Sequence, residues 1–165
     1  MASKNKLNIN HLLRHNKEFL KKIKHAIYLF PSLFDFENKH YFFRQELKQL
    51  KKQHYSQGIQ VTVDRSKMFR IFEDSYEQLR YLSKEEFMGR VHVEFVGERG
   101  QDAGGLMREW FTEIAKEMFN PNLGMFKLAD SGVTYYPDPN SHIHAHHIDY
   151  FKFIGRIIAK AVLEE

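Results

Sequence analysis

The sequence predicts an α+β fold that is mostly helical with a few short strands. Apolar residues recur every three or four positions along several segments, which is typical of amphipathic helices. Two short segments instead alternate apolar and polar residues, which is typical of half-buried strands. The length of 165 residues, with 42% hydrophobic and 15% aromatic residues, is enough for one domain with a bulky core.

The amino-terminal part of the chain predicts two helices. Asn8 or Asn10 can cap the first, which ends before Pro31. The second runs from about Glu37 to Gln53. The apolar positions of the first helix follow helical spacing: Leu12, Leu13, Phe19, Leu20, Ile23 and Ile27.

The central part predicts two strands with short helices between them. Residues 59–63 and 91–96 alternate cleanly and indicate the strands. A short helix is expected around Phe69–Tyr76. Ser83 followed by Glu86 forms a capping box for another.

The carboxy-terminal part predicts two further helices separated by an irregular stretch. The first follows the glycine-rich segment and ends at about Met118, before Asn120-Pro121. The last begins at about His146 and is apolar on most of its circumference, so we expect it to lie inside something larger. It has no stop signal at residues 163–165, and we therefore expect a fragment of a longer protein.

Charge is unevenly distributed along the chain. The net charge is +4, but residues 1–58 carry +8 and residues 59–165 carry −4. A basic half can meet nucleic acid, an anionic membrane or an acidic protein. Its lysines, however, alternate with apolar residues at helical spacing, which a solvated helix face explains: Lys21, Lys22, Lys24, Lys48, Lys51 and Lys52. We therefore favour a solvated face over a nucleic-acid partner and expect no membrane partner, and a binder of nucleic acid or an acidic surface through the basic half is the third hypothesis for the function.

The composition and the short apolar runs bear on where the protein is located and on which kinds of chemistry these residues can perform. The longest apolar runs, such as Ala26–Phe30, are far shorter than the roughly 18 residues of a membrane span, and no targeting segment is visible. We expect an intracellular protein of the cytoplasm, the nucleus or both. Cysteine is absent, which excludes disulfides, thiolate metal sites and a cysteine nucleophile within these residues. No cofactor is expected.

The glycine-rich segment Gly97–Gly105 lies where phosphate-binding loops occur, between a strand and a helix. It lacks the Gly-Lys-Ser/Thr and Gly-x-Gly-x-x-Gly patterns, and Asp102 would repel a phosphate. We expect Asp102 to cap the following helix, and Gly104 and Gly105 to let another backbone approach closely.

Three histidines, His142, His144 and His146, follow one another at every second position. In an extended segment they would point to one side, and imidazole is a good zinc or copper ligand. Because no carboxylate or thiol is fixed beside them, they are only weak metal candidates. A polar loop before a helix is the interpretation we favour.

Arg108, Glu109 and Trp110 lie in the predicted helix that ends at Met118. Neighbours in sequence do not face each other on a helix, so the two charged residues are expected to bridge to other segments. No Gly-x-Ser-x-Gly elbow or other nucleophile signature is present.

Six segments over about 130 residues resemble the HECT domain of ubiquitin ligases, and the Gln-Asp-Ala-Gly-Gly form of the third is most similar to the Huwe/Tom-type branch. They are Leu33-Phe34-Asp35-Phe36-Glu37-Asn38-Lys39-His40-Tyr41-Phe42-Phe43-Arg44, Phe72-Glu73-Asp74-Ser75-Tyr76, Gly100-Gln101-Asp102-Ala103-Gly104-Gly105-Leu106-Met107-Arg108-Glu109-Trp110, Met118-Phe119-Asn120-Pro121, Pro139-Asn140-Ser141 and Tyr150-Phe151-Lys152-Phe153-Ile154-Gly155-Arg156.

The resemblance implies the first part of the family's amino-terminal lobe at residues 31–165, after a leading helix region at residues 1–30. The family accepts ubiquitin from an E2 enzyme as a cysteine thioester and passes it to substrate lysines, so ubiquitin, an E2 and substrate proteins are the implied partners. The E2-binding subdomain and the catalytic cysteine would follow Glu165. This chain alone is therefore expected to be inactive.

The resemblance also assigns residue roles. Asp102, Gly104 and Gly105 would form a tight strand-to-helix connection, and Arg108, Glu109 and Trp110 would lie in the core of the lobe. Nedd-type relatives have a ubiquitin-contacting tyrosine where this chain has Ala103, so that surface is doubtful here. A non-catalytic ubiquitin- or protein-binding module is the alternative function.

Overall fold

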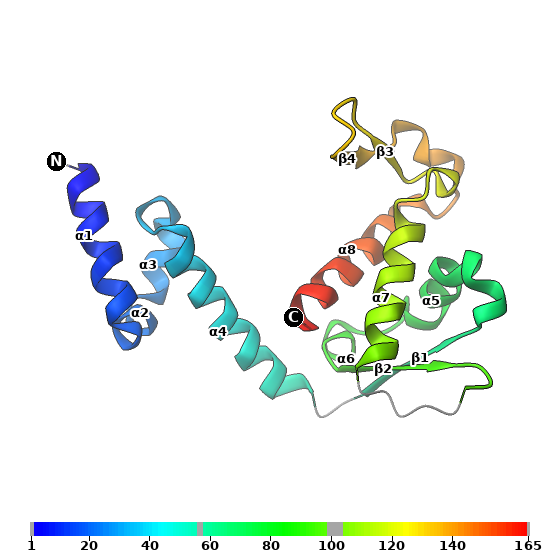
Figure 1. Ribbon diagram of the computed structural model, residues 1–165, viewed down its shortest axis with the longest axis horizontal. Coiled ribbons are helices and arrows are strands. Elements are labelled where there is room, and N and C mark those ends of the chain that lie inside the picture. The colour runs from blue at the N-terminus through cyan, green and yellow to red at the C-terminus, as the bar shows by residue number, and fades with distance from the viewer. Residues whose placement is uncertain (1, 56–57, 99–103, 165) are drawn as a thin grey trace. The chain divides into compact units, whose positions relative to one another are not determined.

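The computed structural model describes residues 2–55, 58–98 and 104–164. Its contacts divide the chain into two compact units, Met1–Gln53 and His54–Glu165. Figure 1 shows the elements of both. The fold is α+β and mostly helical, as the sequence predicts. The boundary that the resemblance places between residues 30 and 31 stays a prediction.

The described part of the first unit holds three short helices, a 3-10 turn and one long helix: α1 (Ala2–His15), α2 (Lys17–Lys22), α3 (Lys24–Leu29), η1 (Pro31–Leu33) and α4 (Phe36–His54). The prediction of one continuous first helix is wrong, because the chain breaks at Asn16 and again at Ile23. The Asn16 side chain accepts a hydrogen bond from the Phe19 N–H at 3.1 Å and so caps a new helix.

Two buried asparagines join α1 to the start of α4. Asn10 and Asn38 are 4% and 0% exposed. The Asn38 amide donates to the backbone carbonyl and the side-chain oxygen of Asn10, both at 3.1 Å. Asn10 in turn donates to the Leu33 carbonyl at 2.9 Å and accepts from the Asp35 N–H at 2.9 Å. One polar network therefore fixes the turn between η1 and α4 against α1.

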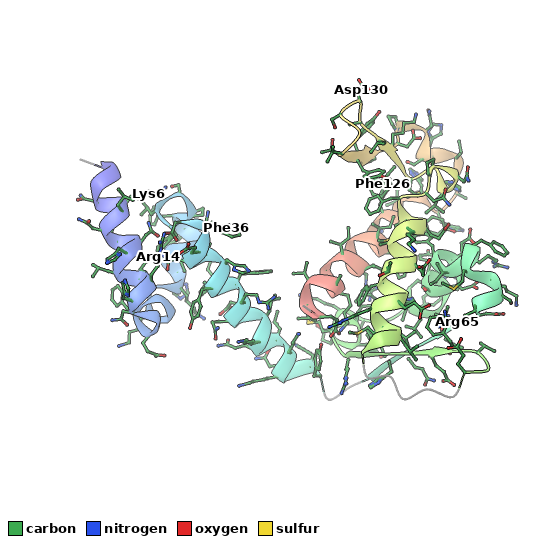
Figure 2. The ribbon with its side chains drawn as sticks, viewed as in Figure 1. Lys6, Arg14, Phe36, Arg65, Phe126 and Asp130 are labelled. Carbon is green, nitrogen blue, oxygen red and sulfur yellow. The ribbon has the colours of Figure 1, made fainter. Side chains whose placement is uncertain are left out.

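An ion pair lies beside this network, and Figure 2 labels its arginine. Arg14 contacts Asp35 at 2.5 Å and Glu37 at 3.0 Å. Burial opposes ionisation of Asp35, but the hydrogen bonds from Arg14 and from the Asn38 N–H hold the pKa of Asp35 below its ordinary value. Below the polar layer, the apolar core is small and consists of Leu13, Ile27, Phe34 and Phe42.

The second unit is built on two parallel strands, β1 (Gly58–Val63) and β2 (Arg90–Phe95), paired from Gly58↔Arg90 to Val63↔Phe95. Both predicted strands are confirmed, and every second residue of each is buried. Because parallel strands need a long crossover, η2 (Arg65–Arg70), α5 (Ile71–Leu79) and α6 (Lys84–Phe87) lie between them. The capping box at Ser83 and Glu86 begins α6, as predicted.

Three helices cover the apolar side of this sheet (Figure 1): α5, α7 (Gly105–Met118) and α8 (His147–Glu164). Helix α5 packs on β1 and α7 packs on β2. The largest fully buried side chains of this unit include Trp110, Phe72, Phe95 and Phe153.

A hairpin replaces most of the expected irregular stretch. It is formed by β3 (Phe126–Leu128) and β4 (Tyr135–Pro137), between the 3-10 turns η3 (Pro121–Leu123) and η4 (Pro139–Ile143). Each strand has only three residues, which is too short for alternation to reveal. The rings of Phe119, Phe126 and Tyr135 pack together and hold the hairpin on the end of α7.

Helix α8 buries one side only. Phe153, Ile154, Ile157 and Leu163 lie in the core, whereas Ile148, Ile158 and Val162 are 54%, 47% and 37% exposed. Among the described residues, no helix is long and apolar enough to span a membrane.

We predict that Asn38→Ala lowers the stability of the first unit by about 1–3 kcal/mol, because the Asn10 oxygen loses its buried donor. Trp110 is the single tryptophan and lies in the second unit, so its fluorescence reports that unit alone, while far-UV circular dichroism reports both. In urea, the dichroism transition should move and the fluorescence transition should not. The exposed Asn8→Ala is the matched control; equal shifts in both signals would show that the units unfold together.

Candidate functional site

The helix that follows the glycine-rich segment begins at Gly105, with Gly104 as its N-cap residue. Gly104 has φ +90°, a left-handed conformation that favours glycine. A Cβ at Gly104 or Gly105 would have no described atom within 4 Å beyond its chain neighbours and its own helix, so the close approach of another backbone stays a prediction. The predicted cap Asp102 and the doubtful ubiquitin position Ala103 lie outside the described residues.

Arg65 joins the two sides of this segment, and Figure 2 labels it beside the sheet. Its guanidinium pairs with Glu98, which precedes the segment, and with Glu109 on α7. Arg65 Nη2 lies 3.3 Å from Glu98 Oε2 and 3.0 Å from Glu109 Oε2. The same guanidinium lies 4.0 Å from the centre of the Phe95 ring. Hydrogen bonding from Arg65 lowers the pKa of Glu109.

Only one of the three signature residues of α7 lies in the core. Trp110 is fully buried, and its indole N–H donates to the buried Ser75 hydroxyl at 3.0 Å. Glu109 is half-buried and makes the bridge to another segment that the sequence predicts. Arg108 is exposed and makes no ion pair with any described residue. A helix has one core-facing side, and Arg108 lies two positions from Trp110, on a different side.

The three histidines do not form a common face. His142 lies in η4, where its Nδ1 is 3.0 Å from the Pro139 carbonyl, and η4 is a 3-10 helix rather than an extended strand. His144 lies against Gly124 and the Tyr150 ring. His146 lines a pocket instead. Within residues 2–55, 58–98 and 104–164, no group of three or more metal-binding side chains is assembled.

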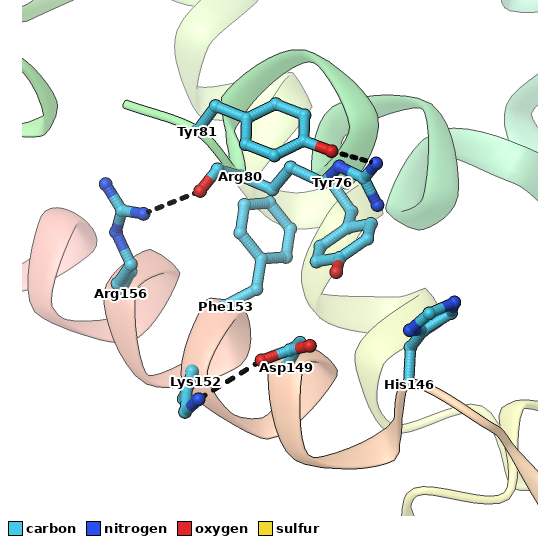
Figure 3. A pocket seen from close by; sticks show the side chains of 8 residues that line it. All are labelled: Tyr76, Arg80, Tyr81, His146, Asp149, Lys152, Phe153 and Arg156. Carbon is cyan, nitrogen blue, oxygen red and sulfur yellow. Dashed lines mark hydrogen bonds and ion pairs between the residues drawn. The ribbon is translucent and has the colours of Figure 1, made fainter. Parts of the chain in front are cut away.

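That pocket is an open hollow of about 490 Å³ between α5 and α8 (Figure 3). Its charged groups are already engaged: Lys152 with Asp149 at 3.1 Å, and Arg80 with Glu77 at 3.2 Å. Arg156 donates to the backbone carbonyls of Leu82 at 2.7 Å and of Ser83 at 3.3 Å. Burial lowers the pKa of Arg156. These contacts join α8 to the turn after α5, which is a structural task rather than a catalytic one.

A second polar cluster was not predicted. Lys160 on α8 is 2% exposed, and its ammonium donates to the carbonyls of Met88, at 3.3 Å, and Gly89 and pairs with Glu164 at 2.9 Å. Glu164 also accepts a hydrogen bond from the Tyr55 hydroxyl. Burial, together with this carboxylate, raises the pKa of Tyr55. The signal in the sequence is a lysine three residues from both Ile157 and Leu163, on the apolar side of the helix.

Together, the described residues assemble a scaffold. Their buried polar groups hold segments to one another. Ser141 Oγ lies 3.4 Å from His147 Nδ1, and this contact joins η4 to the start of α8. The chain also contains no cysteine.

Comparisons with known proteins agree with this picture. The family model described as HECT-domain (ubiquitin-transferase) matches residues 112–165. The E3 ubiquitin-protein ligase HUWE1 of Mus musculus is 41% identical over 158 residues, which is 94% of this chain and 4% of the relative. UPL1 of Arabidopsis thaliana is 37% identical over 163 residues, 99% of this chain and 4% of the relative. TOM1 of Saccharomyces cerevisiae is 33% identical over 159 residues, 95% of this chain and 5% of the relative. The chain thus spans about a twentieth of the length of these relatives.

We predict that Ser75→Ala destabilises the second unit by about 1–3 kcal/mol, because the buried indole N–H of Trp110 loses its acceptor. Urea unfolding followed by Trp110 fluorescence measures the change directly. Ser131→Ala, at an exposed position, is the matched control. An unchanged midpoint for Ser75→Ala would show that the hydrogen bond contributes nothing net.

A second prediction concerns the Arg65 junction, that is, the ion pairs of Arg65 with Glu98 and Glu109. Because Arg65 lowers the pKa of Glu109, the ion pair stabilises the fold above the ordinary pKa of a glutamate and is lost as pH falls through the lowered value. Arg65→Gln should raise the pKa of Glu109 in a carboxyl-carbon NMR titration. The stability difference between this variant and the native chain should vanish in acid. Arg70→Gln, which removes the separate pairs with Glu73 and Asp74, should leave the Glu109 titration unchanged.

Proposed function

Because this chain belongs to the HECT-domain family, as the first part of the amino-terminal lobe, we propose that it is a scaffold segment of a HECT-type E3 ubiquitin-protein ligase. The observation that carries the proposal is identity of 33–41% to E3 ubiquitin-protein ligases over nearly the whole chain. The absence of cysteine indicates that the chain supports the reaction rather than performing it.

In the proposed reaction, a cysteine of the parent protein outside these residues attacks the thioester that joins ubiquitin to an E2 enzyme. The E2 thiolate leaves and a ubiquitin thioester forms on the ligase. A substrate lysine then attacks this thioester, an amide bond forms, and the ligase thiolate is released. The partners we propose are therefore ubiquitin, an E2 and substrate proteins, engaged through segments that this chain does not contain. We propose the cytoplasm, the nucleus or both as the location.

The arrangement of the second unit favours a scaffold role. The sheet, its helices and the ion pairs of Arg65 form a packed frame around the ends of the glycine-rich segment, with Phe95 and Glu98 on one side and Gly104 and Glu109 on the other. A packed frame is suited to carrying other modules at a fixed geometry.

The test is ubiquitin loading. We predict that the parent protein, incubated with E1, E2 and ubiquitin, forms a ubiquitin adduct that reducing agent removes, whereas the 165-residue chain forms none. Replacing the loaded cysteine by serine should leave an oxyester adduct that resists the reducing agent but is cleaved by hydroxide.

The same assay identifies the alternative. Absence of any adduct from the parent protein, with every E2 tested, would contradict the ligase function. If the chain then still binds free ubiquitin, the function of a non-catalytic ubiquitin-binding module would replace the ligase function.

A further inference from the structure

Among the described residues, the parallel sheet of the second unit has two strands, so β1 has an outer edge that does not face β2. The residues that face each side follow from two observations. The Val63 carbonyl accepts a hydrogen bond from the Val96 N–H beyond β2, at 2.9 Å. The Thr62 N–H and carbonyl instead point to Gln78 on α5. Since alternate residues of a strand direct their backbone groups to opposite edges, Gly58, Gln60 and Thr62 face outward.

Gln78 imitates one peptide unit of a missing third strand. Its Oε1 accepts from the Thr62 N–H at 2.9 Å, and its Nε2 donates to the Thr62 carbonyl at 2.9 Å. A neighbouring strand would make the same donor and acceptor pair with its main chain. The edge is therefore closed at Thr62 by a side chain that is itself exposed and replaceable.

We call the Gln78 side chain the plug. Next to it, the backbone groups on the outer edge of β1 are open. Among the described residues, none makes a hydrogen bond to the outward backbone groups of Gln60. A groove of about 350 Å³ runs along this part of the strand. The groove is lined by the half-buried Leu82, by the buried Leu79 and by the exposed Glu86, whose carboxylate also accepts a hydrogen bond from the Ser83 N–H at 2.7 Å.

The chemistry of the groove selects its occupant. Unpaired donors and acceptors at alternate positions of a strand match the backbone of an extended peptide. The carboxylate of Glu86, which lines the groove, disfavours phosphate and nucleic acid and favours a basic side chain in the bound segment.

We propose that the outer edge of β1, at Gly58–Thr62, docks an extended peptide segment of a partner protein as a third strand, with Gln78 as a plug that the peptide displaces. An apolar side chain of the peptide lies against Leu82, and a basic one lies near Glu86. The plug lowers affinity, because the peptide regains at Thr62 only the hydrogen bonds that Gln78 gives up. This site does not depend on ubiquitin transfer, so the ligase assay and the peptide assay fail or succeed separately.

The experiment uses this chain and a fluorescent, capped probe peptide, Thr-Val-Thr-Val-Lys. Binding is measured by fluorescence polarisation and located by amide NMR shifts, which we expect at residues 58–62 and at Leu82. Gln78→Ala should tighten binding by about threefold or more, since the competing amide is removed. An N-methylated probe, in which alternate amides have no N–H, should bind about tenfold more weakly.

Two variants at one position form the matched pair. Gln60→Pro removes the outward N–H and should weaken binding by about tenfold, whereas Gln60→Ala keeps it and should bind within about twofold of the native chain. If the proline variant does not fold, as amide dispersion will show, Gln78→Ala and the N-methylated probe decide the question.

Three results would overturn the proposal. They are equal binding of the N-methylated probe, no effect of Gln78→Ala, and NMR shifts away from residues 58–62. Concentration-dependent shifts at this edge without any probe would indicate pairing between two copies of the chain and would also contradict it. Replacing the lysine of the probe by glutamate should weaken binding; unchanged affinity would remove the role given to Glu86.

Discussion

The second unit depends on burying one face of a parallel strand pair. Two strands alone cannot bury that face, and parallel strands cannot be joined by a tight turn, so the crossover must itself carry the covering helix α5. The remaining cover comes from α7 and α8. Trp110 lies where these parts meet, and its hydrogen bond to Ser75 places a single specific contact within an otherwise apolar core.

Buried polar side chains also join the segments of each unit, through hydrogen bonds to backbone carbonyls. Lys160 binds the carbonyls before β2 from the apolar side of α8, and Arg156 binds those after α5. Asn38 does the same between α4 and α1. The two basic side chains replace the water that backbone carbonyls at the ends of elements would otherwise need, and each of the three groups would be costly to leave buried without its partners. These contacts give a small core a defined arrangement of segments.

Such a frame is suited to the scaffold role proposed for this chain. The ion-paired groups that perturb each other electrostatically, Arg65 with Glu109 and Arg14 with Asp35, lie at junctions between segments rather than beside a nucleophile. Perturbed pKa values often mark catalytic sites, but ion pairs that join segments perturb them as well. The second explanation fits both of these pairs. The open edge of β1 is different in kind, since among the described residues its outward groups have a partner only at Thr62.

The sequence by itself determined the local elements: the alternating strands, the Ser83 capping box and the helix before Asn120 are confirmed because neighbours a few residues apart decide them. It also determined the family, through motifs in order, and the absence of thiol chemistry. Only the tertiary structure decided the parallel pairing, the burial of Trp110 without Arg108, the partners of Lys160 and the open edge of β1. Those depend on residues that lie about 30 to more than 70 positions apart, such as Ser75 with Trp110 and Gly89 with Lys160, and no spacing pattern encodes contacts between them. The histidines show the same limit, because their spacing suggested one face and a 3-10 turn separated them.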